Sequence, residues 1–339
     1  MEDAWVNWAL LGASTIASQY MIAAIRAAQQ GTVGWVVSGN ADRAQEFAKT
    51  HEISQWTTSI ADALADEAVQ AVYISSTNEK HFAQVMAAIA AGKHVLCEKP
   101  LAMTAAQSAE MIAAAKVAGV TLSVNHHLRC AGSHRKIREL IASGAVGRVL
   151  SLRLFHAVHL PEHLRDWRLN APRAGGGAIA DLTVHNADTA RFLLQEDPCT
   201  VVAEMSQSGM GNGVEDSVMS VWTMPSGVMV FSHESFTHPF TESGIEVHGT
   251  DGSIVAIGVF AQDPLGEITL VNRTGRIEVL FDKTEIYEAV IREFTAATRG
   301  RGVPAATGAD GAKALLIATA VREAALTGVC QTISYGVVE

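Results

Sequence analysis

Two side chains with the right spacing for proton transfer stand in the middle of the chain. Asp181 and His185 follow the glycine run 175–177, and four-residue spacing places both on one face of a predicted helix. Histidine titrates near neutral pH and suits general acid–base catalysis, while a carboxylate one turn away can hold the imidazole and raise its pKa. The same spacing also suits a pair that only stabilises a helix, so the spacing leaves both interpretations open.

Lys99 is a candidate for the group that polarises a substrate carbonyl. It comes shortly after the apolar run Val95–Cys97, a predicted strand, so we expect it at the carboxyl edge of a sheet. Open α/β sheets bind their ligands at that edge. An ammonium group there can stabilise negative charge on a substrate oxygen.

The first 125 residues contain the elements that must position Lys99. Short β-rich runs alternate with alanine-rich segments of helical period, which predicts parallel βαβ units and a doubly wound sheet. Strands are expected at Trp8–Leu11, Trp35–Val37, Ala71–Ser75, Val95–Cys97 and Thr121–Val124. Helices are expected over Ile16–Ala28, Ala41–Thr50, Lys80–Ala91 and Ala105–Ala118.

The first strand runs into a turn typical of dinucleotide binding, Gly12-Ala13-Ser14-Thr15-Ile16-Ala17. Gly12 permits the tight turn, and Ala17 is small enough for the helix to pack on the sheet. Ser14 occupies the place of the usual middle glycine, where its hydroxyl can donate to a phosphate at the helix N-terminus. The turn could also be an ordinary strand-to-helix connection.

The end of the second expected strand favours NADP over NAD. NAD enzymes usually carry an acid there to bind the ribose hydroxyls, whereas this chain has Ser38-Gly39-Asn40. Ser38 can bond a 2′-phosphate, and the planar cation of Arg43 can face it. The alternative for Arg43 is a solvated residue paired with Asp42 or Glu46.

After about Asn125 the pattern changes to an α+β one. One helix near Ser133–Ala142 precedes many strands, and turn signals at 225–227 and 250–252 predict antiparallel hairpins in a large open sheet. We therefore expect domains over 1–125 and 126–339. The strands are expected at Val149–Phe155, Val201–Ser206, Asp216–Thr223, Val228–Ser235, Thr241–Gly249, Gly252–Val259 and Glu267–Asn272, and late helices at Ile286–Thr298 and Asp310–Leu326.

Composition narrows the class of ligand. The net charge is −10 with no basic run, which argues against nucleic acid or an anionic membrane, and no apolar run is long enough to span a bilayer. The chain starts without an export signal, so we expect a cytoplasmic protein with a small-molecule substrate. The four cysteines are far apart and the histidines lack ligand spacing, so no metal site is expected.

The motifs together resemble the Gfo/Idh/MocA oxidoreductase family over nearly the whole chain. Besides the turn at 12–17, they are Thr77-Asn78-Glu79 with His81, Glu98-Lys99-Pro100-Leu101-Ala102-Met103, Asn125-His126-His127-Leu128-Arg129, Phe155-His156-Ala157-Val158 and Gly209-Met210-Gly211. Two positions depart from the pattern: His159 stands in place of an aromatic residue, and Asn186 follows His185 where an acid is usual.

The resemblance implies a Rossmann domain, an α+β substrate domain and a set of site residues. Lys99, Asp181 and His185 would form the catalytic group, and these three with His156 would bind substrate. NADP(H) would be held by Gly12, Ala13, Ser14, Thr15, Ile16, Ser38, Arg43, Ser76, Thr77, Asn78, His81, Glu98, Lys99, Trp167 and Arg168. Arg168 is also a candidate for contacting sugar hydroxyls, and both it and His156 are equally compatible with a structural role.

The expected activity is NADPH-dependent hydride transfer to a sugar carbonyl. A dehydrogenase acting on another sugar or an inositol, or a nucleotide or sugar sensor without activity, are the alternatives. The intact set of Lys99, Asp181 and His185 argues against the sensor. An open sheet face can also support self-association, so a homo-oligomer is possible.

Overall fold

The computed structural model describes residues 6–28 and 31–338. Contacts divide the chain into two compact units. The first contains residues up to His127 together with Tyr287–Ala312, and the second contains Leu128–Ile286 and Lys313–Val337. The domain ranges expected from the sequence, 1–125 and 126–339, include residues 1–5, 29–30 and 339, which lie outside the described residues.

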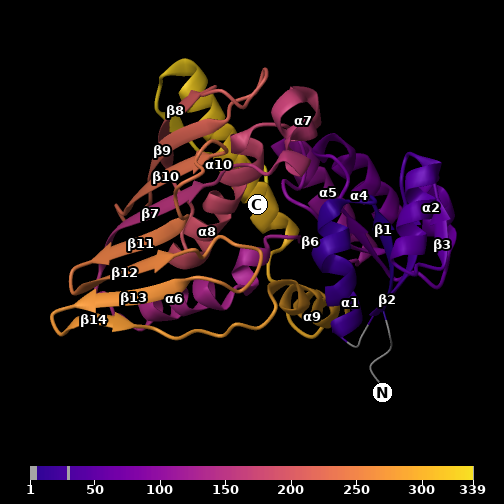
Figure 1. The fold of residues 1–339 in the computed structure, drawn as a ribbon, viewed down its shortest axis with the longest axis horizontal. Helices are drawn as coiled ribbons and strands as arrows, with labels where there is room; N and C mark the ends of the chain where they lie inside the picture. Colours follow the sequence, from indigo (N-terminus) through magenta and orange to yellow (C-terminus); the bar gives the residue numbers. More distant parts are fainter. Residues whose placement is uncertain (1–5, 29–30, 339) are drawn as a thin grey trace. The chain divides into compact units, whose positions relative to one another are not determined.

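The first unit is built on a six-stranded parallel sheet (Figure 1). Its strand order, β3-β2-β1-β4-β5-β6, confirms the predicted doubly wound fold. All four residues of β4 are buried, as expected for a central strand of a parallel sheet. The strands are β1 (Val6–Leu11), β2 (Gly31–Val37), β3 (Gln55–Thr57), β4 (Ala71–Ile74), β5 (His94–Cys97) and β6 (Leu122–Val124).

Two helices of this unit, α2 and α5, have recognisable capping residues. Asn40 caps α2, and Thr104 caps α5 by accepting a hydrogen bond from the Gln107 amide. Gly119 ends α5 in the left-handed conformation. The helices are α1 (Ile22–Ala27), α2 (Ala41–Thr50), α3 (Ile60–Ala65), α4 (His81–Ala90), α5 (Ala105–Ala118) and α9 (Ile286–Thr298), and a π-helical turn (Ala17–Met21) precedes α1.

A late segment of the chain completes the first unit. The ring of Phe294 on α9 packs on the buried ring of Trp8, with centroids 5.1 Å apart. The Ser123 hydroxyl donates to the Ala306 carbonyl oxygen over 2.7 Å. Residues from both ends of the sequence therefore share one hydrophobic core.

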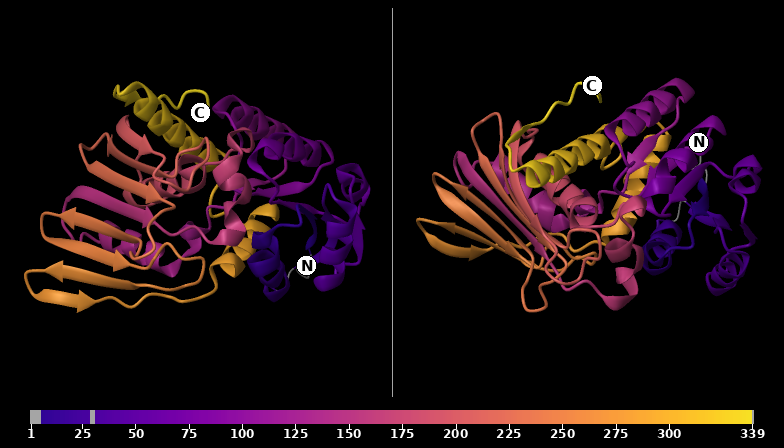
Figure 2. Two further views of the ribbon diagram at one scale, coloured as in Figure 1. Left: turned by 45° about the horizontal axis from the view of Figure 1, so that its top comes forward. Right: turned by 90° about the horizontal axis from the view of Figure 1, so that it is seen from above.

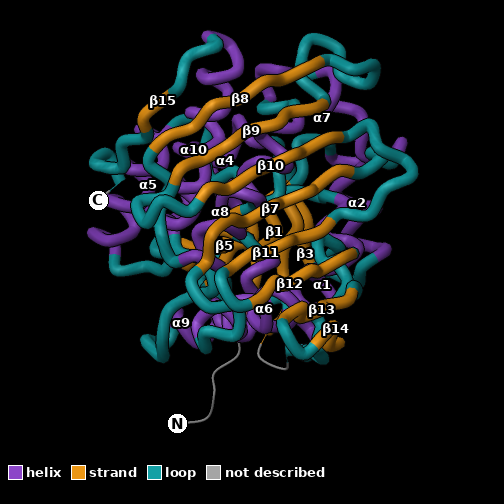
Figure 3. Tube along the Cα trace, turned by 90° about the vertical axis from the view of Figure 1, so that its left-hand side faces the viewer, coloured by secondary structure: helices purple, strands orange, loops and turns teal. Residues whose placement is uncertain are grey.

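The second unit contains a nine-stranded sheet, ordered β14-β13-β12-β11-β7-β10-β9-β8-β15 (Figure 3). Its pairs are antiparallel except for β7 with β10, which confirms the predicted mostly antiparallel sheet. The strands are β7 (Val149–Ala157), β8 (Thr200–Ser206), β9 (Ser217–Thr223), β10 (Met229–Ser235), β11 (Gly244–Gly249), β12 (Gly252–Ile257), β13 (Glu267–Asn272), β14 (Gly275–Glu278) and β15 (Gln331–Thr332).

Helices α6, α8 and α10 pack on one face of this sheet (Figure 2). Val218 and Trp222 of β9 point into that core, while Met219 and Val221 between them are exposed, as strand alternation requires. Among the described helices, none has the length and apolar character needed to cross a membrane. The helices of the unit are α6 (Gly132–Ala142), α7 (Arg165–Asn170), α8 (Val184–Leu194) and α10 (Gly308–Thr327).

Candidate active site

The turn after β1 requires glycine at its first position. Gly12 has a φ of 131°, and a Cβ there would lie 2.9 Å from the backbone carbon of Ser75. The Ser14 hydroxyl donates to the Ser75 hydroxyl over 2.7 Å and accepts from the Ala17 amide over 3.2 Å. Ser14 therefore caps the following helix and joins the turns after β1 and β4. Its predicted bond to a phosphate stays a prediction.

Arg43 lies against the same turn. Asn40 caps α2 by accepting from the Arg43 amide over 2.9 Å, which fixes the start of the helix. The Arg43 guanidinium donates from Nε to the Ala13 carbonyl oxygen over 3.1 Å. Ser38 directly follows β2 at the same carboxyl edge of the sheet and is half-buried. The two expected phosphate ligands thus lie near the turn at 12–17.

His81 connects the loops that follow β4 and β5. Its Nδ1 lies 2.8 Å from the Pro100 carbonyl oxygen, and its Nε2 lies 3.1 Å from the Ser76 carbonyl oxygen. The ring is fully buried, and that burial lowers the pKa of His81. His81 therefore shapes the loop carrying Lys99 through backbone contacts. Thr77 and Asn78 lie between Ser76 and His81 in the sequence.

Glu98 is held in one orientation by two neighbours. Its Oε1 accepts from the Tyr73 hydroxyl and from Asn125 Nδ2, each over 2.6 Å. Tyr73 is fully buried, and burial together with the Glu98 charge raises the pKa of the phenol. The half-buried Lys99 follows Glu98 at the end of β5. Fixed geometry at Glu98 limits the positions that the Lys99 backbone can take.

The glycine run at 175–177 allows a loop to pack tightly before the helix with Asp181 and His185. A Cβ at Gly176 would lie 2.8 Å from the carbonyl oxygens of both Trp167 and Arg168. The Gly177 amide donates to the Arg168 carbonyl oxygen over 2.9 Å. The loop is thereby tied to α7, so Trp167 and Arg168 are positioned beside the helix start.

The helix that carries Asp181 and His185 starts with a π-helical turn. Residues Ile179–Thr183 form a π-helical turn, and α8 starts only at Val184. Asp181 is therefore in the wider turn and His185 is in the α-helix. Such π-helical turns are often found at functional sites. A helix is therefore present through both residues, as predicted, and its first part is π-helical.

Five predicted site residues gather in the second unit. Arg168 Nε donates to Asp181 Oδ2 over 3.2 Å, and its guanidinium lies over the Trp167 ring. The buried rings of His156 and His185 have centroids 6.0 Å apart. Asp181 is thus bound by a cation, and His185 lies beside a second imidazole. Lys99 belongs to the first unit.

Two acidic residues near this group were not predicted from the sequence. Glu215 accepts from the Ile179 amide over 3.0 Å and pairs through both oxygens with Arg322 of α10. Glu234 of β10 accepts from Asn186 Nδ2 over 2.8 Å. Glu215 and Glu234 are far in sequence from Ile179 and Asn186, so no local sequence motif indicates these contacts.

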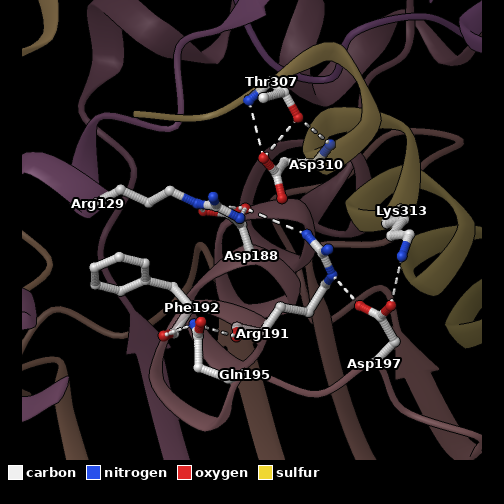
Figure 4. Close-up of polar contacts among 9 residues, drawn as sticks. All are labelled: Arg129, Asp188, Arg191, Phe192, Gln195, Asp197, Thr307, Asp310 and Lys313. Atoms are coloured by element: carbon white, nitrogen blue, oxygen red, sulfur yellow. Dashed lines mark hydrogen bonds and ion pairs between the residues drawn. The ribbon is translucent and has the colours of Figure 1, made fainter. Parts of the chain in front are cut away.

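Asp188 and Arg191 of α8 take part in a connected set of ion pairs (Figure 4). Asp188 pairs with Arg129 over 2.7 Å and with Arg191 over 3.8 Å. Arg191 and Lys313 then share Asp197, at 2.5 and 2.7 Å. These contacts anchor α8 at Asp188, three residues after His185.

Two family models match consecutive parts of the chain. Residues 6–126 match the oxidoreductase family with an NAD-binding Rossmann fold, and residues 134–255 match the GFO/IDH/MocA C-terminal domain. These matches confirm the resemblance stated from the motifs and include the turn at 12–17, Lys99, Asp181 and His185.

Curated relatives extend the match over both units. The chain is 48% identical to the 1,5-anhydro-D-fructose reductase of Ensifer adhaerens, covering 97% of this chain and 99% of the relative. It is 30% identical to a D-xylose 1-dehydrogenase (NADP(+)) of Haloferax volcanii, covering 94% of this chain and 97% of the relative.

Solved structures share the fold at low identity. The aldose-aldose oxidoreductase of Caulobacter crescentus, complexed with glycerol, has a TM-score of 0.89 at 24% identity and covers 97% of this chain and 100% of its own. A levoglucosan dehydrogenase complexed with NADH and L-sorbose has a TM-score of 0.87 at 23% identity, covering 97% and 99%. With both family models and the full-length relatives in agreement, the chain belongs to the Gfo/Idh/MocA family of oxidoreductases.

Proposed function

We propose that the protein reduces 1,5-anhydro-D-fructose to 1,5-anhydro-D-mannitol with NADPH, in the cytoplasm. One observation carries the proposal: 48% identity to a reductase of that name extends over 97% of the chain. The residues with suitable chemistry, Lys99, Asp181 and His185, all lie within that span.

The first unit has the features needed to hold the dinucleotide. The position of Gly12 leaves no room for a side chain beside Ser75, so the backbone of the turn stays accessible to a pyrophosphate. Ser38 and Arg43, with no acid at the end of β2, form a donor set suited to a 2′-phosphate. Glu98, fixed by Tyr73 and Asn125, would accept from the nicotinamide ribose. The bound cofactor would supply the hydride that reduces the carbonyl carbon.

Protein side chains would supply the proton and stabilise the charge on oxygen. In the proposal, His185 donates a proton to the C2 oxygen as that oxygen becomes an alcohol. Lys99 stabilises negative charge on the same oxygen before the proton arrives. Asp181, bound by Arg168, orients His185 and favours its protonated form. His156, whose ring lies beside that of His185, would bind a sugar hydroxyl.

The test is a side-by-side assay of coenzyme and substrate. Purified protein is given NADPH or NADH with 1,5-anhydro-D-fructose and D-fructose, and NADP⁺ or NAD⁺ with D-xylose and myo-inositol, and kcat/KM is measured for each pair. The expected result is the highest kcat/KM for 1,5-anhydro-D-fructose with NADPH, and 1,5-anhydro-D-mannitol as the product. A preference for NADH, or for oxidation of an aldose, would show that the proposal is wrong.

A second candidate function is an NADP-dependent dehydrogenase of another sugar. It is favoured by the 30% identity to a D-xylose 1-dehydrogenase that also covers nearly the whole chain. The same set of substrates separates the two functions, because the dehydrogenase would oxidise D-xylose with NADP⁺ faster than it reduces the anhydro sugar. Absence of turnover with every sugar, combined with tight NADPH binding, would instead favour a sensor.

A further inference from the structure

Glu234 is a carboxyl group buried in the core of the second unit. It lies on β10, its exposed fraction is 0%, and its side chain points to the sheet face covered by α8. Its Oε1 accepts from Asn186 Nδ2 over 2.8 Å and from the Ser232 hydroxyl over 2.5 Å. Asn186 also donates to the Ser232 hydroxyl over 2.9 Å, which closes a ring of three residues.

The partners that hold Glu234 carry no charge. Burying a carboxylate without a cation is costly, so a purely structural ring would be more stable with a neutral residue at this position. Burial raises the pKa of Glu234 to about 7, although the bonds from Ser232 and Asn186 act in the opposite direction. The carboxyl therefore changes its charge in the pH range in which histidines titrate.

Two of the site histidines are neighbours of this ring. His156 of β7 is in register with Glu234, and adjacent residues in register point to the same face of a sheet. His185 precedes Asn186 in α8, and its ring centroid lies 6.0 Å from that of His156. Glu234, His156 and His185 therefore belong to one buried group on the helix-covered side of the sheet.

The other groups around Glu234 do not titrate in this range. Thr183 lies on the helix side, and Val218 is the partner in register on β9. Beyond His156 lies His134 of α6, and burial lowers the pKa of His134 to about 3, so it is neutral. His156 and His185 are the ionisable side chains that the strand register and the ring contact place beside Glu234 and Asn186.

We propose that Glu234 is a positioning residue that holds Asn186 at the start of α8 and sets the charge of His185 and His156. An ionised Glu234 favours a proton on the imidazoles, and a neutral one disfavours it, so the three groups share their protons. The proposal rests on the proposed function insofar as His185 is the proton donor. It adds a second ionisable group, Glu234, whose charge affects the protonation of that donor.

The decisive variant is Glu234→Gln, which keeps the shape and removes the charge. The matched control is Glu204→Gln, an exposed glutamate on β8 of the same sheet. Histidines labelled with ¹³C are titrated by NMR without substrate, and His156→Asn and His185→Asn variants assign the two resonances. We expect both imidazole pKa values to fall by about half a unit to one unit in Glu234→Gln and to stay unchanged in Glu204→Gln.

The kinetic counterpart is the pH profile of kcat. In Glu234→Gln, the alkaline limb should move to lower pH by the same amount, while the Kd for NADPH stays within about twofold of the wild-type value. If the protein fails to reduce the anhydro sugar, the proposed function fails, but the NMR titration still tests Glu234. Unchanged imidazole titrations in Glu234→Gln would overturn the inference.

A swap variant covers the case in which Glu234→Gln does not fold. Asn186→Asp combined with Glu234→Gln keeps an acid and an amide in the ring with their places exchanged. The carboxylate is then at position 186, next to His185 in sequence. The imidazole pKa of His185 should return to the wild-type value or above. A folded swap variant in which the His185 pKa remains below the wild-type value would contradict the assignment of charge control to this ring.

Discussion

Arg168 on α7 binds Asp181 on the π-helical turn, from Nε to Oδ2 over 3.2 Å. The two side chains are only partly exposed, at 23% and 13%. Because Asp181 precedes His185 by one turn, this contact connects α7 to the proposed proton donor. Arg168 therefore has a role within the protein that is separate from any contact with cofactor or sugar.

Arg168→Met should lower kcat by about 10- to 100-fold. A hydrogen bond to a charged group contributes roughly 1.5–3 kcal/mol, and each 1.4 kcal/mol corresponds to a factor of ten. Steady-state kinetics with saturating NADPH measures the effect. Arg173→Met is the control, since Arg173 is exposed on the neighbouring turn. Equal kcat values for the two variants would remove Arg168 from the catalytic arrangement.

Lys99→Met and His185→Asn should not be additive. Loss of the proton donor is expected to cost about 10²–10⁴ in kcat, and loss of a charge-stabilising donor about 10²–10³. Groups that act on one oxygen as a unit lose less together than the product of their separate losses. A double-mutant cycle measures the coupling, with the exposed Lys80→Met as control. Strictly multiplicative losses would mean that the two residues do not act on the same atom.

Arg43→Ala should weaken NADPH binding and leave NADH binding nearly unchanged. The guanidinium is the candidate partner of the 2′-phosphate, which NADH lacks, so KM for NADPH should rise by about 10- to 100-fold. The exposed Lys49→Ala on the same helix serves as control. A parallel rise in KM for both coenzymes would assign Arg43 only to the shape of the turn.

His134 should make the fold sensitive to acid. Burial lowers its pKa from 6.5 to about 3, so between these values the unfolded chain binds a proton that the folded protein does not. Stability must then fall as pH falls from 6.5 towards 3, by several kcal/mol in total. Urea unfolding at pH 7, 6, 5 and 4 should show a smaller loss for His134→Gln than for wild type. For the control His163→Gln, at an exposed position, the free energy of unfolding should depend on pH as in wild type. The same pH dependence in His134→Gln would show that His134 does not cause the loss of stability in acid.

Asp188→Asn should be much more destabilising than loss of a surface carboxylate. The Asp188 side chain is 3% exposed, and Asp188→Asn removes the negative charge beside the guanidinium groups of Arg129 and Arg191, which are 12% and 9% exposed. Breaking such a buried pair costs about 3–5 kcal/mol, against at most about 1 kcal/mol for an exposed pair. Chemical unfolding compares it with Glu139→Gln, whose side chain is 64% exposed. Similar losses in both variants would show that the ion pairs do not anchor α8.

Periodicity predicted the long elements because their side chains have one buried face. Helices α2 and α5 have the predicted bounds, and each starts after a residue whose side chain caps it. Strand β3 was missed because its three residues are largely exposed, and β15 has only two residues. Such short edge strands depend on the neighbouring strand and leave little pattern of their own.

Candidate site residues were proposed from the sequence only where they form local motifs. The turn at 12–17 and the Asp181 and His185 pair have fixed spacing within one segment. Glu234 meets Asn186 from a position 48 residues away, and that contact depends on the register of β10 on β7. A one-residue change of register would turn Glu234 to the other face, and a single sequence does not specify the register.

The packing of Phe294 on Trp8 has a consequence for how the protein is made. During synthesis the first 127 residues emerge well before α9. Trp8 therefore lacks its packing partner Phe294 until residues 128–286 have been translated. A fragment cut after His127 would therefore lack part of its own interior. A nucleotide-binding unit that folds on its own would need residues 287–312 joined to residues 1–127, because both segments contribute to its core.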